Sequence, residues 1–233
     1  PNCVSYDPTY AFELAVIVRS GLERMYEKHE NIFYYITTMN ELYAHPEMPE
    51  NSEEGIIKGM YSLKSVGQGD KQVQLMGSGT ILREVEIAAQ MLADDWGVKS
   101  DVWSVTSFNE LAREAQAIDR VNRFSTDVAK VPYITQCLED AKGPVIVATD
   151  YMRNYAEQVR KYVPNRYEVL GTDGFGRSDS RAALRDFFEV DANYVVLASL
   201  KALVDEGEMN SSVIAQAIEK YGININKPNP MVV

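Results

Sequence analysis

The sequence predicts an α/β protein, specifically a three-layer α/β/α domain with a mostly parallel sheet. Short segments rich in β-branched residues alternate along the chain with longer segments whose apolar residues recur at helical spacing. Strands that alternate with helices favour parallel pairing in a layered domain. With 233 residues, 45% of them hydrophobic, the chain is long enough to bury a sizeable core.

The first segment predicts one helix, one strand and a linker. Apolar residues recur at helical spacing over 9–30, and Asp7-Pro8 supplies a cap and a turn before them. Residues 32–38 (IFYYITT) are β-branched and aromatic, which predicts a buried strand. Residues 39–52 contain two prolines and little periodicity, so we expect a loop there.

The rest of the chain predicts a regular alternation of strands and helices. Gly97 is placed to end a helix in the left-handed conformation, and Ser107 with Glu110 has the spacing of a capping box. The predicted strands are 73–76, 101–106, 144–148 and 167–170. The predicted helices are 81–95, 107–123, 132–140, 151–162, 181–188, 193–206 and 211–221, followed by a tail over 227–233.

The charge of the chain argues against a nucleic-acid partner, and its uneven distribution suggests two structural units. The chain has 34 acidic and 23 basic residues, a net charge of −11, whereas a nucleic-acid binder must neutralise phosphates with Lys and Arg. We therefore expect no nucleic-acid partner. Residues 1–53 hold 9 acids and 3 bases, and residues 54–233 hold 25 acids and 20 bases. This asymmetry favours a division of the chain at residue 53.

The cysteines and the hydropathy of the sequence indicate the cellular compartment that we expect for the protein. Cys3 and Cys137 lie far apart and match neither a disulfide framework nor a zinc site, so we expect reduced thiols and a cytoplasmic location. No apolar run approaches the roughly 20 residues of a membrane helix, and no signal peptide is visible, so we expect no membrane partner. Because the first residue is Pro1 rather than Met, we expect a fragment or a processed product.

The sequence Gly77-Ser78-Gly79 lies between a predicted strand and a predicted helix. Backbone N–H groups and the helix dipole could hold an anion at such a place. The full dinucleotide pattern needs a further Gly where Leu82 stands, and no phosphate-loop Lys follows. We interpret these glycines as a tight strand-to-helix turn, with a ligand loop as the alternative.

The loop 171–181 is the densest polar cluster and follows the carboxyl end of a predicted strand, where ligands bind in open α/β sheets. Its arginines could grip a carboxylate or a phosphate in a bidentate manner. The interpretation that we favour is a rigid loop whose Asp and Arg residues pair with one another or with another subunit. The candidate ligand or interface residues in this loop are Asp173, Arg177, Ser178, Asp179 and Arg181.

Catalytic patterns are missing from the sequence. His29 and His45 have no partner at metal-ligand spacing, and Ser78 lacks the flanking residues of a nucleophile elbow. Cys137 falls on a predicted helix, where we expect a small packed side chain. We therefore predict no catalytic, cofactor-binding or metal-ligating residue in this chain.

Several longer strings resemble a known enzyme family. The glycine turn, its amphipathic helix and residues 101–111 resemble the C-terminal domain of the transketolase superfamily, and so do residues 175–178 with Leu184 and Phe187. The strings resemble more closely the homodimeric pyruvate dehydrogenases, the thiamine-diphosphate-dependent first component of the bacterial pyruvate dehydrogenase complex. They are PNCVSYDP (1–8), YYITTMNE (34–41), SVTSFNELAR (104–113), ATDYM (148–152), VLGTDGFGRSDSR (169–181) and DANYVV (191–196).

This resemblance implies a domain assignment and an activity. It implies that residues 1–53 are the end of the pyrimidine-binding middle domain plus a linker, and that residues 54–233 are a transketolase-like C-terminal domain. The full family member decarboxylates pyruvate on thiamine diphosphate and Mg and acetylates a lipoyl group, as an acetyl-transferring oxidoreductase linked to glycolysis. Its implied partners are the rest of the dehydrogenase subunit, a second copy in a homodimer, and the dihydrolipoyl acetyltransferase component of the multienzyme complex.

The family's cofactor motif is missing from this chain. Gly69-Asp70 is followed by Lys71, and no Asn pair follows, so no family catalytic residue can be assigned to a position here. We expect the chain alone to bind no cofactor and to be inactive, with a structural role in dimer and complex assembly. Since residues 1–53 resemble a cut domain, we also expect an apolar face there without partners, which favours oligomers.

Two alternatives remain open at this level. The acidic balance is compatible with a free-standing interaction module that binds a basic region of an acyltransferase component. The two glycine-rich loops are compatible with a small α/β enzyme that binds a phosphorylated ligand, although the chain offers no His or Cys chemistry for it.

Overall fold

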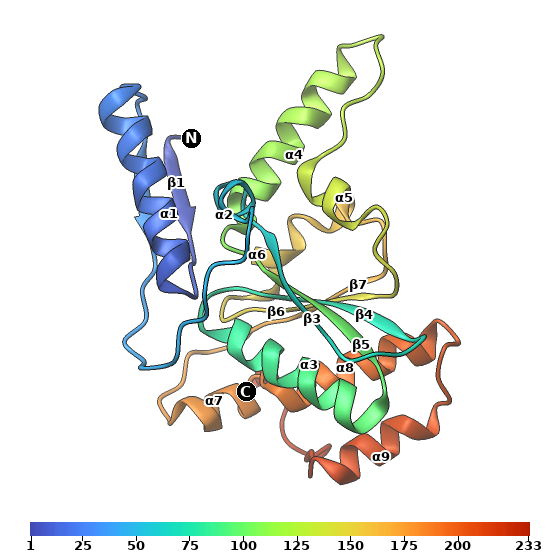
Figure 1. Ribbon diagram of the computed structural model, residues 1–233. Coiled ribbons are helices and arrows are strands. Elements are labelled where there is room, and N and C mark those ends of the chain that lie inside the picture. Colours follow the sequence, from blue (N-terminus) through green and yellow to red (C-terminus); the bar gives the residue numbers. More distant parts are fainter.

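The computed structural model describes residues 1–233 and contains two sheets (Figure 1). The larger sheet has five strands in the order β3-β5-β4-β6-β7, and only β3 runs antiparallel to its neighbour. The predicted mostly parallel sheet is therefore confirmed. The strands are β1 (Cys3–Tyr6), β2 (Phe33–Ile36), β3 (Tyr61–Val66), β4 (Gln72–Gly77), β5 (Lys99–Ser104), β6 (Val145–Ala148) and β7 (Tyr167–Leu170).

Helices lie on both faces of the larger sheet, with α3, α8 and α9 on one side and α4, α5 and α6 on the other (Figure 1). None of the helices is both long enough and apolar enough to cross a membrane. The helices are α1 (Ala11–Leu22), α2 (Glu53–Lys58), α3 (Leu82–Trp96), α4 (Phe108–Arg123), α5 (Tyr133–Leu138), α6 (Arg153–Glu157), α7 (Arg181–Phe187), α8 (Ala192–Asp205) and α9 (Ser212–Lys220).

The central strands are buried on both faces, which explains their continuous apolar sequences. In β6, Val145 and Val147 belong to one core cluster, whereas Ile146 and Ala148 belong to the other. All four side chains have no exposed surface. The sheet therefore separates two hydrophobic cores, and the predicted three-layer arrangement is confirmed.

Residues 1–36 form a separate β1-α1-β2 unit at one side of the larger sheet (blue in Figure 1). The strands β1 and β2 pair in parallel, with Cys3 opposite Phe33. The inner face of this unit packs on α2 and β3, because Ile17 shares a buried cluster with Ile56 and Tyr61. The first segment is thus attached to the main domain through an apolar contact.

The outer face of this β1-α1-β2 unit is apolar and exposed, as expected for a segment without its partners. Its large exposed side chains are Val18, Leu22, Tyr26, Phe33 and Tyr35, between 42% and 71% exposed. The strand predicted over 32–38 is confirmed as β2, but the prediction that it is buried is wrong. The strand β2 has β1 as its only neighbour, and alternate side chains point to an uncovered face.

Four further elements differ from the sequence prediction. The helix predicted over 9–30 is α-helical only in α1, continues as a π-helical turn over Glu23–Glu27, and ends before His29, which has a φ of +53°. The strands β1 and β3 were not predicted. The helix predicted over 151–162 is interrupted after α6, where the Gln158 side chain donates to the Tyr155 carbonyl, and resumes as the 3₁₀ turn Arg160–Tyr162.

The contact between the β1-α1-β2 unit and α2 predicts unequal effects of two neighbouring substitutions. Ile17 is fully buried, so Ile17→Ala should lower the free energy of unfolding by about 2–4 kcal/mol. Val18 is 42% exposed on the same helix, so Val18→Ala should change it by less than about 0.5 kcal/mol. Urea denaturation of both variants tests this. Equal losses would mean that the contact does not stabilise the fold.

Candidate functional site

The carboxyl ends of the parallel strands meet at one edge of the larger sheet. The chain passes from β4 to β5 on one side and later returns to β6 on the other, so the strand order reverses between β4 and β6. Ligands of open α/β proteins bind outside the strand ends at such a switch point. We therefore take the loops that follow β4, β6 and β7 as the candidate functional site.

The glycines after β4 form a packed turn. A Cβ on Gly77 would lie 2.7 Å from the Leu82 Cα, so only glycine permits this approach of strand and helix. Gly79 has a φ of +52°, its N–H donates to the Asp7 carbonyl over 3.1 Å, and its carbonyl accepts from the Thr9 hydroxyl. Ser78 is buried beside Thr149. The geometry supports the turn interpretation, because the Gly79 N–H is used within the chain.

Asp7 anchors the first segment at this edge. Its carboxylate accepts three hydrogen bonds of 2.8 Å, from the hydroxyls of Thr37, Tyr151 and Tyr155. Its backbone N–H donates to the Thr106 carbonyl, which follows β5. With 5% of its surface exposed, Asp7 joins the first segment to the loops after β4, β5 and β6.

Glu13 is a second buried carboxylate in the same contact. It is fully buried, and one oxygen accepts from the Tyr61 hydroxyl at 2.7 Å and the Ser104 hydroxyl at 2.6 Å. The other oxygen accepts from the backbone N–H groups of Thr9 and Tyr10. Burial raises the pKa of the Glu13 carboxyl, and these four hydrogen bonds oppose that rise.

Side chains at the beginning of α4 hold β1 at the same edge. The Ser107 hydroxyl donates to the Ser5 carbonyl at 2.7 Å and accepts from the Glu110 N–H, so the predicted helix cap is confirmed. The Arg113 guanidinium donates to the Cys3 carbonyl at 2.8 Å. These contacts satisfy carbonyl groups of β1 that would otherwise be open.

In the loop 171–181, no acidic residue forms an ion pair with a basic residue of the same loop, so the expectation that they pair with one another is wrong. Asp173 accepts from Arg153 at 2.8 Å. Arg181 donates to Asn40 at 2.7 Å, and the Arg177 guanidinium lies 4.5 Å from the ring centre of Phe187. Ser178 and Asp179 are exposed and contact no distant element, although the Asp179 carboxylate accepts from the Ser180 N–H. The structure thus separates the candidate residues of this loop.

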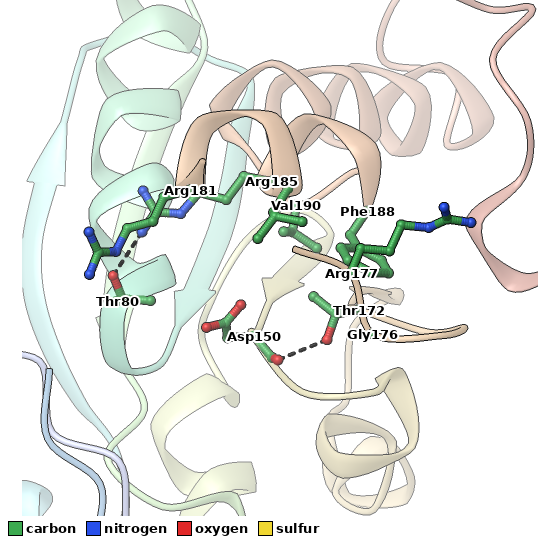
Figure 2. A pocket seen from close by; sticks show the side chains of 10 residues that line it. Thr80, Asp150, Thr172, Gly176, Arg177, Arg181, Arg185, Phe188 and Val190 are labelled. Atoms are coloured by element: carbon green, nitrogen blue, oxygen red, sulfur yellow. Dashed lines mark hydrogen bonds between the residues drawn. The ribbon is translucent and has the colours of Figure 1, made fainter. Parts of the chain in front are cut away.

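A cavity of about 290 Å³ opens between this loop and the strand ends (Figure 2). Its polar lining residues Thr80, Asp150 and Thr172 follow β4, β6 and β7 in turn. These three residues were not predicted from the sequence, and neither was Arg185, which lies one helical turn after Arg181. Thr80, Asp150 and Thr172 could have been chosen as candidates because they follow predicted strands, and ligands bind at the carboxyl ends of such strands. Burial raises the pKa of Asp150, and Arg185 opposes the rise.

The residues with possible nucleophilic or metal-binding chemistry are scattered. His29 is exposed, and His45 accepts the Ala11 N–H at 3.1 Å. Cys3 and Cys137 are both free thiols; burial raises the pKa of Cys137, and a hydrogen bond from Tyr133 opposes this. No group of three or more His, Cys, Asp or Glu side chains converges on a point that could hold a metal ion. The arrangement can bind and orient groups, but it brings no nucleophile beside a base.

Two protein families match successive parts of the chain. Residues 1–46 match the family described as "Pyruvate dehydrogenase E1 component middle domain". Residues 59–191 match the family described as "Transketolase-like TK C-terminal domain". A solved transketolase from Leishmania mexicana is 20% identical, with a TM-score of 0.57 over 88% of this chain and 26% of that one, which is a likeness of fold.

Curated relatives match nearly the whole chain at higher identity. The pyruvate dehydrogenase E1 component of Pseudomonas aeruginosa is 57% identical over 234 residues, which is 99% of this chain and 26% of that protein. The E1 component of Escherichia coli K12 is 57% identical over 233 residues, with the same coverage. The chain thus spans about a quarter of the length of these relatives.

The saturated carboxylate of Glu13 predicts a large cost when it is removed. Glu13→Ala leaves four donors without an acceptor, so we expect the free energy of unfolding to fall by at least about 3 kcal/mol. Glu27→Ala is the control, because Glu27 is exposed just after the same helix, and this variant should unfold at the urea concentration of the wild type. Equal unfolding of the two variants would show that the Glu13 network contributes nothing.

The close approach at Gly77 predicts a second contrast. Gly77→Ala places a methyl group against the backbone of α3 and should cost about 1–3 kcal/mol. For a chain of this size, each kcal/mol lowers Tm by about 2–4 °C. Gly176→Ala meets no atom within 4 Å, and its Tm should stay within about 2 °C of the wild type. Calorimetric melting that fails to separate the two variants would contradict the packed-turn interpretation.

Proposed function

This chain belongs to the family of transketolase-like C-terminal domains. We propose that it is the C-terminal part of a pyruvate dehydrogenase E1 component and that it serves this enzyme through assembly. The observation that carries the proposal is the rigid junction between the β1-α1-β2 unit and the sheet edge, built on Asp7 and Glu13. We place the division at residue 53, with the end of the middle domain and its linker before it and the C-terminal domain after it.

In this proposal the activity belongs to the complete subunit. The subunit decarboxylates pyruvate and acetylates a lipoyl group of a dihydrolipoyl acetyltransferase, and thiamine diphosphate with Mg supplies the electron sink when bound. The residues of this chain do not fit that cofactor. Asp70 lies in the exposed turn between β3 and β4 with no Asn pair after it, and no cluster of metal-binding side chains is present. We therefore propose that the residues that hold the cofactor belong to other parts of the subunit.

The exposed face of the β1-α1-β2 unit is where we expect the rest of the subunit to attach. A two-stranded sheet is marginal by itself, and the outer edge of β2 lacks a paired strand, whereas carbonyls of β1 accept from Ser107 and Arg113. The exposed apolar side chains Leu22, Phe33 and Tyr35 border that open sheet. We propose that the preceding part of the middle domain adds strands and covers this face, and that the subunit then forms a homodimer.

We further propose a cytoplasmic location, which the two free thiols favour because disulfides are rare in reducing compartments. We do not propose either alternative, the free-standing interaction module or the small enzyme, because the curated relatives named above are E1 components that match this chain over almost its whole length.

Reconstitution tests this proposal. The isolated chain should show no pyruvate decarboxylation and no heat of binding for thiamine diphosphate with Mg in calorimetry. Co-expression with the preceding part of an E1 subunit should restore pyruvate decarboxylation. Saturable cofactor binding by the isolated chain would overturn the assembly role.

A matched pair of variants locates the contact. Leu22 on α1 and Ile87 on α3 are both 51% exposed. Leu22→Glu should lower the reconstituted activity by at least about tenfold, which corresponds to 1.4 kcal/mol. Ile87→Glu should leave reconstitution unchanged, and both isolated variants should unfold like the wild type. Equal reconstitution by the two variants would contradict the proposed attachment face.

A further inference from the structure

The cavity at the strand ends has one strongly basic corner (Figure 2). Arg185 is only 13% exposed there and donates to Glu84 at 2.8 Å and to the Thr80 hydroxyl at 2.9 Å. These two bonds fix the guanidinium on the same side as that of Arg181 (Figure 2). Because the Thr80 hydroxyl accepts from Arg185, its own proton remains free to be donated to a ligand.

Two arginines near this corner are not held by a close carboxylate. Arg181 is 57% exposed and lies 3.8 Å from the nearest carboxylate oxygen, which belongs to Glu41. Arg177 makes no ion pair and stacks on the ring of Phe187, with its guanidinium directed away from Asp150 (Figure 2). Both side chains are long and exposed. To turn toward an anion, Arg181 would give up its hydrogen bond to Asn40, and Arg177 would give up its contact with the Phe187 ring.

Glu41, from the linker between the two units, supplies the anion that this corner holds at present. One carboxylate oxygen accepts from Arg83 at 2.7 Å. The other is buried, has no hydrogen-bond partner, and lies 3.6 Å from Arg185. The hydrogen bond from Arg83, with the charges of Arg185 and Arg181, holds the pKa of Glu41 below its usual range. This oxygen is a buried acceptor without a donor, so the charge of Arg185, and not a hydrogen bond from it, holds Glu41 at the corner.

We propose that this cavity binds a small hydroxylated phosphate monoester, with the phosphate at Arg181, Arg185 and Thr80. The residues that line the cavity include three arginines, Arg177, Arg181 and Arg185, and one acid, Asp150. Positive charge is therefore in excess along the cavity wall, although Arg185 also pairs with Glu84. Guanidinium groups suit phosphate because they offer parallel donors to its oxygens. This binding site is independent of the assembly role proposed above. The proposal concerns reversible binding only and includes no chemical reaction.

The opposite side of the cavity is suited to the hydroxylated carbon chain of such a ligand. The Thr172 hydroxyl donates to the Asp150 carbonyl at 2.8 Å, which leaves the Asp150 carboxyl free to accept from ligand hydroxyls. Asp150 is the only acid among the lining residues, and Leu184, Phe188 and Val190 form an apolar wall. At about 290 Å³ the cavity suits a compact metabolite, at the low end of small-molecule sites.

The phosphate would compete with Glu41 for Arg181 and Arg185. Ligand binding should therefore loosen the linker around residue 41, and removal of the Glu41 charge should strengthen binding. This reciprocal relation follows from linkage between two anions that share the same cations.

Calorimetric titration of the 233-residue chain with glycerol 3-phosphate tests the proposal. Inorganic phosphate is the control for the phosphate group without the hydroxylated carbon chain. Malonate is the control for a carboxylate in place of phosphate. Glycerol is the control for the hydroxylated chain without a charge. We expect glycerol 3-phosphate to bind at least about tenfold more tightly than malonate, and glycerol not to bind. Equal affinity for malonate and glycerol 3-phosphate, or no binding of either, would overturn the proposed ligand class.

Variants locate the site within the chain. Arg181→Gln should weaken glycerol 3-phosphate binding by about tenfold, and Glu41→Gln should strengthen it several-fold. Arg123→Gln, on the exposed end of α4, is the control with the same loss of charge and should leave the affinity unchanged. Arg185 is unsuitable as the primary variant because its ion pair with Glu84 is buried, so Arg177→Gln is the second variant and should weaken binding. Affinities that fall equally in the Arg181 and Arg123 variants would show nonspecific charge attraction and overturn the site.

Discussion

Two buried carboxylates determine how this chain is organised. Asp7 accepts three hydroxyl donors and Glu13 accepts four donors, drawn from both sides of the contact between the first segment and the sheet. A buried carboxylate is tolerated only when its oxygens are saturated, so this geometry permits little sliding or rotation. The β1-α1-β2 unit is therefore fixed at the carboxyl ends of β4, β5 and β6. The unit covers part of the sheet edge where the strand order reverses, between β4 and β6. The cavity near Asp150 is the part of this edge that stays uncovered.

Local sequence patterns predicted the elements whose causes are local. The buried strands of the parallel sheet, the left-handed Gly97 and the Ser107 cap depend on residues within a few positions, and all three were predicted. The contacts of Asp7 could not be predicted in this way, because Tyr151 lies 144 residues further along the chain. The same limit applies to the cavity, whose lining residues come from three loops and α7. The exposure of β2 was missed because the composition of a strand does not reveal how many neighbours it has.

The position of the acidic residues has a different meaning once the contacts are known. The excess of acids in residues 1–53 first suggested a separate unit, and two of those acids, Asp7 and Glu13, attach that unit to the sheet. Glu41 adds a third contact, through Arg83. The remaining open surface of the unit is apolar rather than acidic, which fits a role in attaching further protein. The segment that stands out by its excess of acidic residues is thus also the segment that buried carboxylates attach to the sheet.

The central claim is that residues 1–36 and the larger sheet form one rigid body through these carboxylates. Hydrogen exchange followed by mass spectrometry measures this directly, because amides in a cooperative unit open together. In a single rigid body, the amides of β1 and of Asp7 should exchange as slowly as those of β4 and β5. Rapid exchange over residues 3–7, with the sheet still protected, would contradict it.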